Sequence, residues 1–146
     1  MPGGYFFKAL SQWSDYQSRA RRAEFWNFVV VAWLIEVFAV ALTATMISSA
    51  VDSTAMTVDT NEISTLGWVF VWVTAALWLF FLFPILAVTV RRMHDLGRSG
   101  AWAILLFIAP LAIVPWIMAL FDGQPITNKY GPDPKGRGVS DQGAAT

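Results

Sequence analysis

The sequence predicts an all-α integral membrane protein with three transmembrane helices, a short N-terminal interfacial helix and an irregular C-terminal tail. Three observations support this fold class. Of the 146 residues, 56% are hydrophobic and only 14% are charged, whereas soluble domains carry about 25% charged residues. Three apolar stretches are each long enough to cross a bilayer. The basic residues fall in three blocks that lie outside those stretches.

The apolar stretches cover residues 25–47, 66–90 and 101–121. A spanning helix needs about 20 mostly apolar residues, because it rises about 1.5 Å per residue through about 30 Å of hydrocarbon. Separate spans must be helical, since backbone groups in lipid need partners within their own segment. We therefore expect a single membrane domain over residues 1–146.

The third stretch leaves two alternatives open. It contains Pro110 and Pro115, and proline removes a backbone donor and kinks a helix. A single crossing places the tail outside, whereas a kinked re-entrant hairpin returns it to the cytoplasm. A length of about 21 residues favours the crossing, while the three Lys and Arg of the tail favour the hairpin. We predict three crossings.

The charge distribution predicts the orientation. Basic residues lie before the first span, in the 91–100 loop and in the tail, and the 48–65 segment carries three acidic residues and no basic one. Cytoplasmic loops of membrane proteins are enriched in Lys and Arg. The N-terminus and the 91–100 loop should therefore be cytoplasmic, with the 48–65 segment outside.

The two ends of the chain should lie outside the hydrocarbon. In the segment 5–17, Phe6, Leu10 and Trp13 follow an i, i+4, i+7 spacing that puts them on one helix face, which is typical of an interfacial amphipathic helix. The tail, residues 122–146, is rich in glycine and proline, so we expect turns there rather than a further span.

Three sequence patches also resemble a known family. They are SRARRAEFW at 18–26, RRMHDLGRSG at 91–100 and NKYGPDP at 128–134. Their order and spacing resemble the bacterial inner-membrane family called "domain of unknown function 805", which includes YhaH/YhaI-like proteins, over about residues 5–135. The resemblance implies a small multi-pass protein of the bacterial inner membrane. It supplies no catalytic residues.

Polar residues at the cytoplasmic ends of the first two spans are the main site candidates. They are Arg19, Arg21, Arg22, Arg91, Arg92, His94, Asp95 and Arg98. In one hypothesis they anchor the topology, with Glu24 and Asp95 paired to nearby arginines. In the other they bind an anionic phospholipid headgroup or a protein partner, because the arginine fork holds phosphate through two hydrogen bonds. The two hypotheses are compatible.

Catalysis and metal binding have little support in the sequence. The chain has one histidine and no cysteine, so a zinc ion at His94 would need carboxylates or water for its other ligands. An enzyme acting on lipid headgroups through His94, Asp95 and Arg92 is a third hypothesis. We predict no catalytic residue, no metal and no cofactor, and the zero net charge argues against nucleic acid as a partner.

Glu36 is the one acidic residue within a predicted span. It should lie near the bilayer centre, where an ionised carboxylate is costly and marks a candidate functional group. Thr74 and Trp78, at similar depth, are the expected hydrogen-bond partners. We favour a neutral Glu36 bonded across the helix pair; alternatively, it is the proton- or cation-linked group of a small transporter or channel component.

These observations together predict a non-catalytic membrane protein. Its basic cytoplasmic face should bind membrane lipids, anionic phospholipids among them, or another membrane protein. We also expect a homo-oligomer. Any conduction would require one, because three helices enclose little pore volume of their own.

Overall fold

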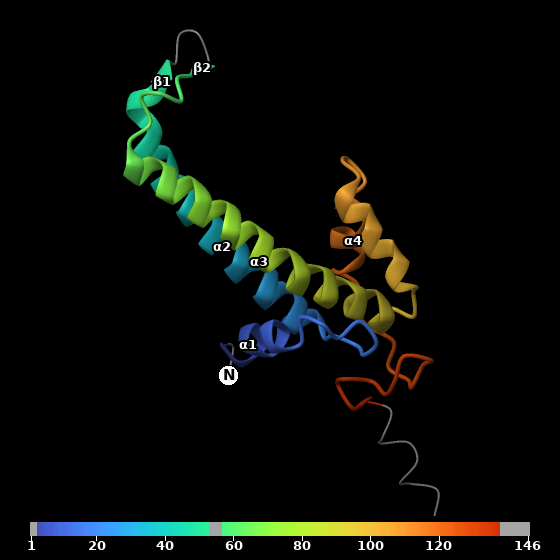
Figure 1. Ribbon diagram of the computed structural model, residues 1–146. Helices are drawn as coiled ribbons and strands as arrows, with labels where there is room; N and C mark the ends of the chain where they lie inside the picture. The colour runs from blue at the N-terminus through green and yellow to red at the C-terminus, as the bar shows by residue number, and fades with distance from the viewer. Residues whose placement is uncertain (1–2, 53–56, 138–146) are drawn as a thin grey trace, which may run out of the picture. The chain divides into compact units, whose positions relative to one another are not determined.

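The computed structural model describes residues 3–52 and 57–137 (Figure 1). The predicted tail, 122–146, is therefore described only as far as residue 137. The elements in chain order are α1 (Gly3–Ser11), α2 (Arg22–Ile47), the 3-10 helix η1 (Ser48–Ala50), β1 (Val51–Asp52), β2 (Thr57–Val58), α3 (Thr65–Asp95), the 3-10 helix η2 (Gly100–Phe107) and α4 (Ile113–Met118).

The chain divides into two compact units. The terminal unit comprises Met1–Val29 and Phe83–Thr146, and the central unit comprises Val30–Leu82. Helices α2 and α3 each contribute to both units. The expectation of one membrane domain over the whole chain stays a prediction.

Helices α2 and α3 correspond to the first two predicted spans. They contain 26 and 31 residues, and both are long and apolar enough to cross a membrane. Only 17% and 11% of their most apolar windows are buried inside the protein. A core helix of a soluble protein would be mostly buried, so these exposed apolar surfaces suit a lipid environment.

In the central unit, a pair of threonines joins the two helices. The Thr43 and Thr74 hydroxyls lie 2.8 Å apart, and Thr43 also donates to the Ala39 carbonyl at 2.9 Å. Beyond the end of α2, β1 and β2 form a short antiparallel pair in which Val51 lies opposite Val58. The sequence analysis did not predict this pair.

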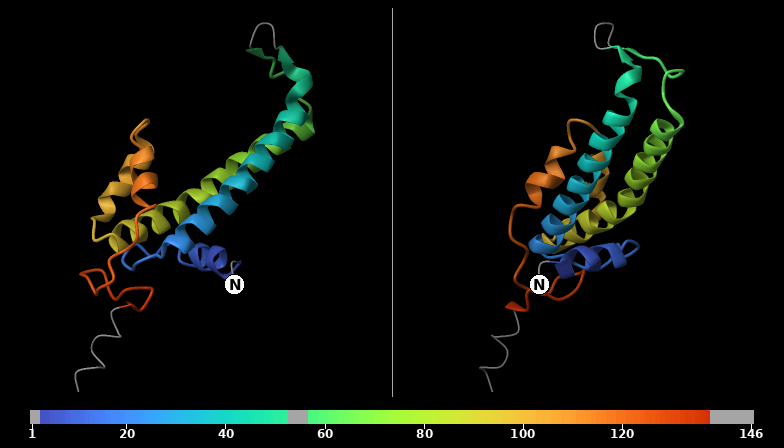
Figure 2. Two further views of the ribbon diagram at one scale, coloured as in Figure 1. Left: turned by 180° about the vertical axis from the view of Figure 1, so that it is seen from behind. Right: turned by 90° about the vertical axis from the view of Figure 1, so that its left-hand side faces the viewer.

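The predicted third span, 101–121, is not a continuous helix, so a third transmembrane helix is not confirmed. The chain instead forms η2, a turn around Pro110, and the six-residue α4. Proline lacks the N–H that a continuing helix needs, which explains the interruption. Helices η2 and α4 pack against each other as a hairpin (Figure 2). Their lengths of about 16 and 9 Å are each well below the bilayer thickness.

Aromatic contacts build the core of the terminal unit. Phe6 of α1 stacks on Phe28 at 5.3 Å between ring centroids. In α4, Trp116 meets Phe25 at 6.2 Å and Trp26 at 5.8 Å, both edge to face. These contacts hold α1 and the η2–α4 hairpin against the first turns of α2.

The predicted interfacial segment, 5–17, is helical only in part. Helix α1 ends at Ser11, and a turn follows. Phe7 and Trp13 are exposed, as a segment lying in the membrane surface requires. Its position at the membrane interface stays a prediction.

Candidate functional site

The two predicted polar patches meet in the terminal unit. The backbone N–H of Ala20 donates to the carbonyl of Arg91 at 3.1 Å, which joins the segment before α2 to the last turns of α3. Five charged side chains come together here and are at most 6% exposed. We call them the arginine network: Arg19, Glu24, Arg91, Arg92 and Asp95.

Glu24 connects three helices of this unit. Its carboxylate accepts a hydrogen bond from Arg91 of α3 at 2.6 Å and from Lys8 of α1 at 2.7 Å. The same Arg91 nitrogen donates to the Gln12 side chain at 2.7 Å. A fully buried carboxylate is tolerated only when it is paired and hydrogen-bonded, and Glu24 meets both conditions.

Asp95 connects α3 to the N-terminal segment. Its carboxylate accepts from Arg19 at 3.0 Å and forms a second ion pair with Arg92. Arg92 in turn donates to the carbonyl of Phe121, just beyond α4. The expected pairing of Glu24 and Asp95 with nearby arginines is therefore confirmed.

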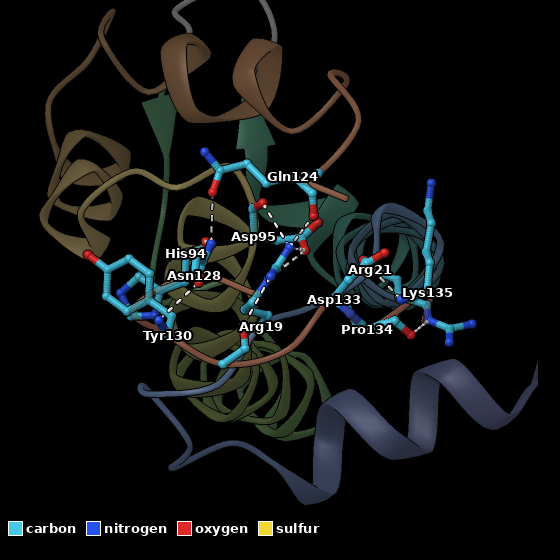
Figure 3. A network of polar contacts seen from close by, with 12 residues as sticks. Arg19, Arg21, His94, Asp95, Gln124, Asn128, Tyr130, Asp133, Pro134 and Lys135 are labelled. Carbon is cyan, nitrogen blue, oxygen red and sulfur yellow. Dashed lines mark hydrogen bonds and ion pairs between the residues drawn. The ribbon is translucent and has the colours of Figure 1, made fainter. Parts of the chain in front are cut away.

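Arg19 binds both Asp95 and the tail (Figure 3). Its guanidinium donates to the carbonyls of Gln124 at 2.6 Å, Ile126 at 2.8 Å and Gly131 at 3.1 Å. One buried side chain therefore fixes the path of the tail beside the segment that precedes α2.

The tail also caps the C-terminus of α3, where helical carbonyls lack partners within the helix. The Gln124 N–H donates to the Asp95 carbonyl at 2.9 Å, and the Asn128 amide donates to the His94 carbonyl at 3.0 Å. Gly123 permits this approach, since a Cβ there would lie 2.0 Å from the Asp95 carboxylate.

His94 is held by the tail rather than by its neighbour Asp95. Its ring stacks on Tyr130 at 3.6 Å with an interplanar angle of 6°, and its Nδ1 lies 3.3 Å from the Ser18 carbonyl. The Asp95 carboxylate is occupied by two arginines, so the two residues do not form a base oriented by a carboxylate. Within 3–52 and 57–137, no cluster of three or more His, Cys, Asp or Glu is suited to a metal ion.

The remaining predicted arginines lie outside the arginine network. Arg21 donates to the Pro134 carbonyl, and the exposed Arg22 donates to the Leu120 carbonyl at 3.2 Å. Arg98 is exposed, and its side chain makes no hydrogen bond or ion pair with any described residue. The structure thus separates arginines that hold the fold from arginines that face the surroundings.

A second ionic cluster, which the sequence analysis missed, lies in the tail. Asp122 pairs with Lys135 and with Arg137, the latter at 2.8 Å, and Arg137 also pairs with Asp133 at 2.8 Å. The Lys135 ammonium lowers the pKa of Asp122 to about 2. The hydrogen bond from Arg137 likewise holds the pKa of Asp133 below its usual range.

Glu36 does not make the predicted contacts. Its Oε1 is buried without a hydrogen-bond partner among the described residues. Thr74 bonds instead to Thr43 and toward the Ala39 carbonyl, one to two helical turns from Glu36. Trp78 is exposed, and no bond joins it to Glu36 in the described part of the chain.

The sequence analysis missed the tail residues that complete the site, Gln124 above all. Asn128 and Tyr130 belong to the third patch of the family resemblance, so a signal for them was present. Gln124 acts mainly through its backbone N–H and carbonyl. Every residue except proline has both groups, so the sequence does not single Gln124 out.

The fold and site define a class of protein: a helical chain with two bilayer-length apolar helices and a buried arginine–carboxylate network beside them. Within this class, the chain belongs to the family described as "Protein of unknown function (DUF805)", which matches residues 13–132. The resemblance inferred from the three sequence patches is confirmed.

Two of the similar proteins are named as inner membrane proteins of Escherichia coli (strain K12). The chain is 27% identical to "Inner membrane protein YhaI" over 135 residues, covering 90% of this chain and 95% of the relative. It is 32% identical to "Inner membrane protein YhaH" over 139 residues, covering 90% and 96%. A stretch of 28 residues, 19% of each chain, is 64% identical to "Uncharacterized protein YiiR". No solved structure matches the chain.

Proposed function

We propose that this chain is a non-catalytic, multi-pass protein of the bacterial inner membrane that binds anionic phospholipid headgroups through surface arginines on its cytoplasmic face. The observation that carries the proposal is Arg98, which is exposed and has no partner among the described residues. A guanidinium binds phosphate through two parallel hydrogen bonds.

The position of the surface arginines supports this assignment. Arg98 directly precedes the η2–α4 hairpin, and Arg22 bonds to Leu120 near its other end. Residues 99–121 contain no charged side chain. If the hairpin enters the hydrocarbon, both arginines lie at headgroup level, where cationic side chains contact lipid phosphates.

The arginine network has a different role in this proposal. Arg91 and Arg92 are fully buried and paired with carboxylates, so a headgroup would have to displace these partners. We assign them to holding α1, α2, α3 and the tail together. This moves the proposed lipid contact from the buried arginines to Arg98 and Arg22.

Lipid retention tests the proposal. Arg98→Gln and Arg22→Gln should each reduce the phosphatidylglycerol and cardiolipin that stay bound in native mass spectrometry from mild detergent. Lys135→Gln is the matched control, because it removes one positive charge from the same unit but from a cation already paired with Asp122. Unchanged retention in both arginine variants would contradict lipid binding at this face.

We further propose that the chain crosses the membrane twice and inserts η2–α4 as a re-entrant hairpin, with both ends in the cytoplasm. Support comes from Arg19, whose bonds to the carbonyls of Gln124 and Ile126 bring the tail beside the segment preceding α2. The basic residues at both ends favour the same side.

Cysteine labelling tests the topology, since the chain contains no cysteine. An impermeant thiol reagent added outside intact cells should label Thr57→Cys and leave Ser99→Cys and Thr127→Cys unmodified. Labelling of Thr127→Cys from outside, with Ser99→Cys protected, would restore three crossings. Labelling of Ser99→Cys would reverse the orientation.

A small transporter or channel component is the second candidate function. It is favoured by the buried Glu36 Oε1, which lacks a hydrogen-bond partner among the described residues and lies within α2. An ionisable group inside a span often belongs to an ion pathway. Proton or cation flux into liposomes that is lost in Glu36→Gln would establish this function, and absence of flux in the wild type would remove it.

A further inference from the structure

The surface of α2 around Trp33 and Glu36 is unusual for a lipid-facing helix. The two residues are three positions apart, so they are neighbours on the helix surface. Trp33 is 61% exposed, and Glu36 is half-buried. Both lie within two residues of the midpoint of the 26-residue helix, close to the expected centre of the bilayer.

Each of the two side chains leaves a polar group unsatisfied. The Glu36 Oε1 is enclosed by the chain without a hydrogen bond, whereas its Oε2 is not enclosed. Neither Oε2 nor the Trp33 indole N–H has a partner among the described residues. An unpaired polar group in hydrocarbon is strongly unfavourable, because no water is present to pair with it. Tryptophan is normally placed at the membrane–water interface, where its N–H finds a partner.

Neither the described residues nor the surrounding lipid offers a partner at this level. The threonine hydroxyls of the central unit are already engaged, since Thr43 and Thr74 bond to each other and to the Ala39 carbonyl. Acyl chains carry neither donors nor acceptors at the middle of the bilayer. Another polypeptide can supply partners to the two accessible groups.

We propose that a second copy of this chain covers the surface, with the Trp33 indole of each copy donating a hydrogen bond to the Glu36 carboxyl of the other. The surface carries one unpaired donor, the Trp33 indole N–H, and one unpaired acceptor, the Glu36 Oε2, which is not enclosed as Oε1 is. Two identical surfaces related by a twofold axis therefore satisfy each other, because the interface is self-complementary. A partner of different sequence would need the same donor and acceptor in matching positions.

This inference goes beyond lipid binding and does not depend on it. Arg98 and Arg22 belong to the terminal unit, whereas Trp33 and Glu36 belong to the central unit. Loss of lipid retention and loss of self-association can therefore be observed separately.

Disulfide cross-linking in native membranes tests the interface. Val40 lies about 40° around α2 from Glu36, and Phe38 lies about 160° away, at about 100° per residue. Both are exposed, so Phe38→Cys is a matched control for Val40→Cys. With copper–phenanthroline as the oxidant, Val40→Cys should give a product of twice the 16.2 kDa chain mass, and Phe38→Cys should give little.

Further substitutions in the Val40→Cys chain test the hydrogen bonds. Glu36→Leu and Trp33→Phe should each reduce the dimer about fivefold for every interhelical hydrogen bond lost. Glu36→Gln should keep it, because the amide oxygen still accepts. Trp72→Phe is the control for losing an exposed indole from the same unit. Trp33→Phe keeps an aromatic ring at an exposed position, so the fold should survive.

Three outcomes would overturn the proposal. One is equal cross-linking at Val40→Cys and Phe38→Cys, which would indicate random collision. Another is a dimer unaffected by both Glu36→Leu and Trp33→Phe. The third is a cross-linked product whose mass differs from twice that of the chain, because the occupant would then be a different protein.

Discussion

Two buried carboxylates, Glu24 and Asp95, each hold two basic side chains. Three of these four cations are buried arginines. Removing charges from water is expensive, and their mutual attraction offsets this cost only while every member keeps its partners. The arginine network is therefore sensitive to the loss of a single carboxylate.

Asp95→Asn should lower the free energy of unfolding by about 3–5 kcal/mol, because it leaves Arg19 and Arg92 as buried cations without a counter-charge. Thermal unfolding in detergent, followed by circular dichroism, measures the effect. Asp122→Asn is the control: Asp122 also pairs with two cations, but its side chain is 49% exposed. It should change stability by less than about 1 kcal/mol. Equal effects of the two substitutions would show that burial of Asp95 does not determine its contribution.

Gly123→Ala should weaken the docking of the tail. The added Cβ would lie 2.0 Å from an Asp95 carboxylate oxygen, so the tail or the carboxylate must move, at a cost of about 1–3 kcal/mol. Hydrogen–deuterium exchange of residues 124–131 should become faster. Gly4→Ala is the control, because nothing lies within 4 Å of its added Cβ. Unchanged exchange in Gly123→Ala would mean that the tail does not rest on Asp95.

At the scale of elements, the sequence predicts helices α2 and α3 well and the segment 101–121 poorly. Length and apolar composition identify a bilayer-length helix. A proline within an apolar stretch, in contrast, is compatible with a kinked continuous helix and with an interrupted one. The path of the tail could not be predicted from the sequence, for a different reason. Arg19 holds it through the carbonyls of residues more than 100 positions away, and carbonyls are present in every residue.

The ionic cluster of the tail should persist to low pH. Asp122 has a pKa of about 2 in the folded protein, below about 3.9 in an unfolded chain. Its ion pairs therefore contribute fully above pH about 4 and are lost as the pH falls through about 2. Carboxyl ¹³C NMR in micelles should show Asp122 still ionised at pH about 3. Lys135→Gln should move the midpoint upward, and an unchanged midpoint would remove Lys135 as the cause.

At the scale of the whole molecule, sequence position alone does not separate a structural arginine from an exposed one. Arg91 and Arg98 stand in the same motif, and the sequence analysis placed both in one candidate headgroup site. Burial distinguishes them: Arg91 faces Glu24 inside the terminal unit, whereas Arg98 lies beyond the end of α3. The pairing of arginines with Glu24 and Asp95 was predictable, because opposite charges were expected at one depth.

The charges are divided between the two units. All ten Lys and Arg belong to the terminal unit, whereas the central unit carries four acidic residues and no basic one. Short loops rich in Lys and Arg resist translocation. This division supports a cytoplasmic position for the loops of the terminal unit and an external position for the 48–64 loop.

Adding basic residues to the external loop should therefore disturb insertion. The triple variant Thr57→Arg, Thr60→Arg and Asn61→Arg adds three positive charges to a loop that has none. In a Ser49→Cys chain, the fraction labelled by an impermeant reagent outside cells should fall, because loops that contain several Lys or Arg are held in the cytoplasm. The same three positions changed to Gln are the control and should label like the parent chain. If the arginine variant labels equally well, the charge of this loop does not determine the orientation.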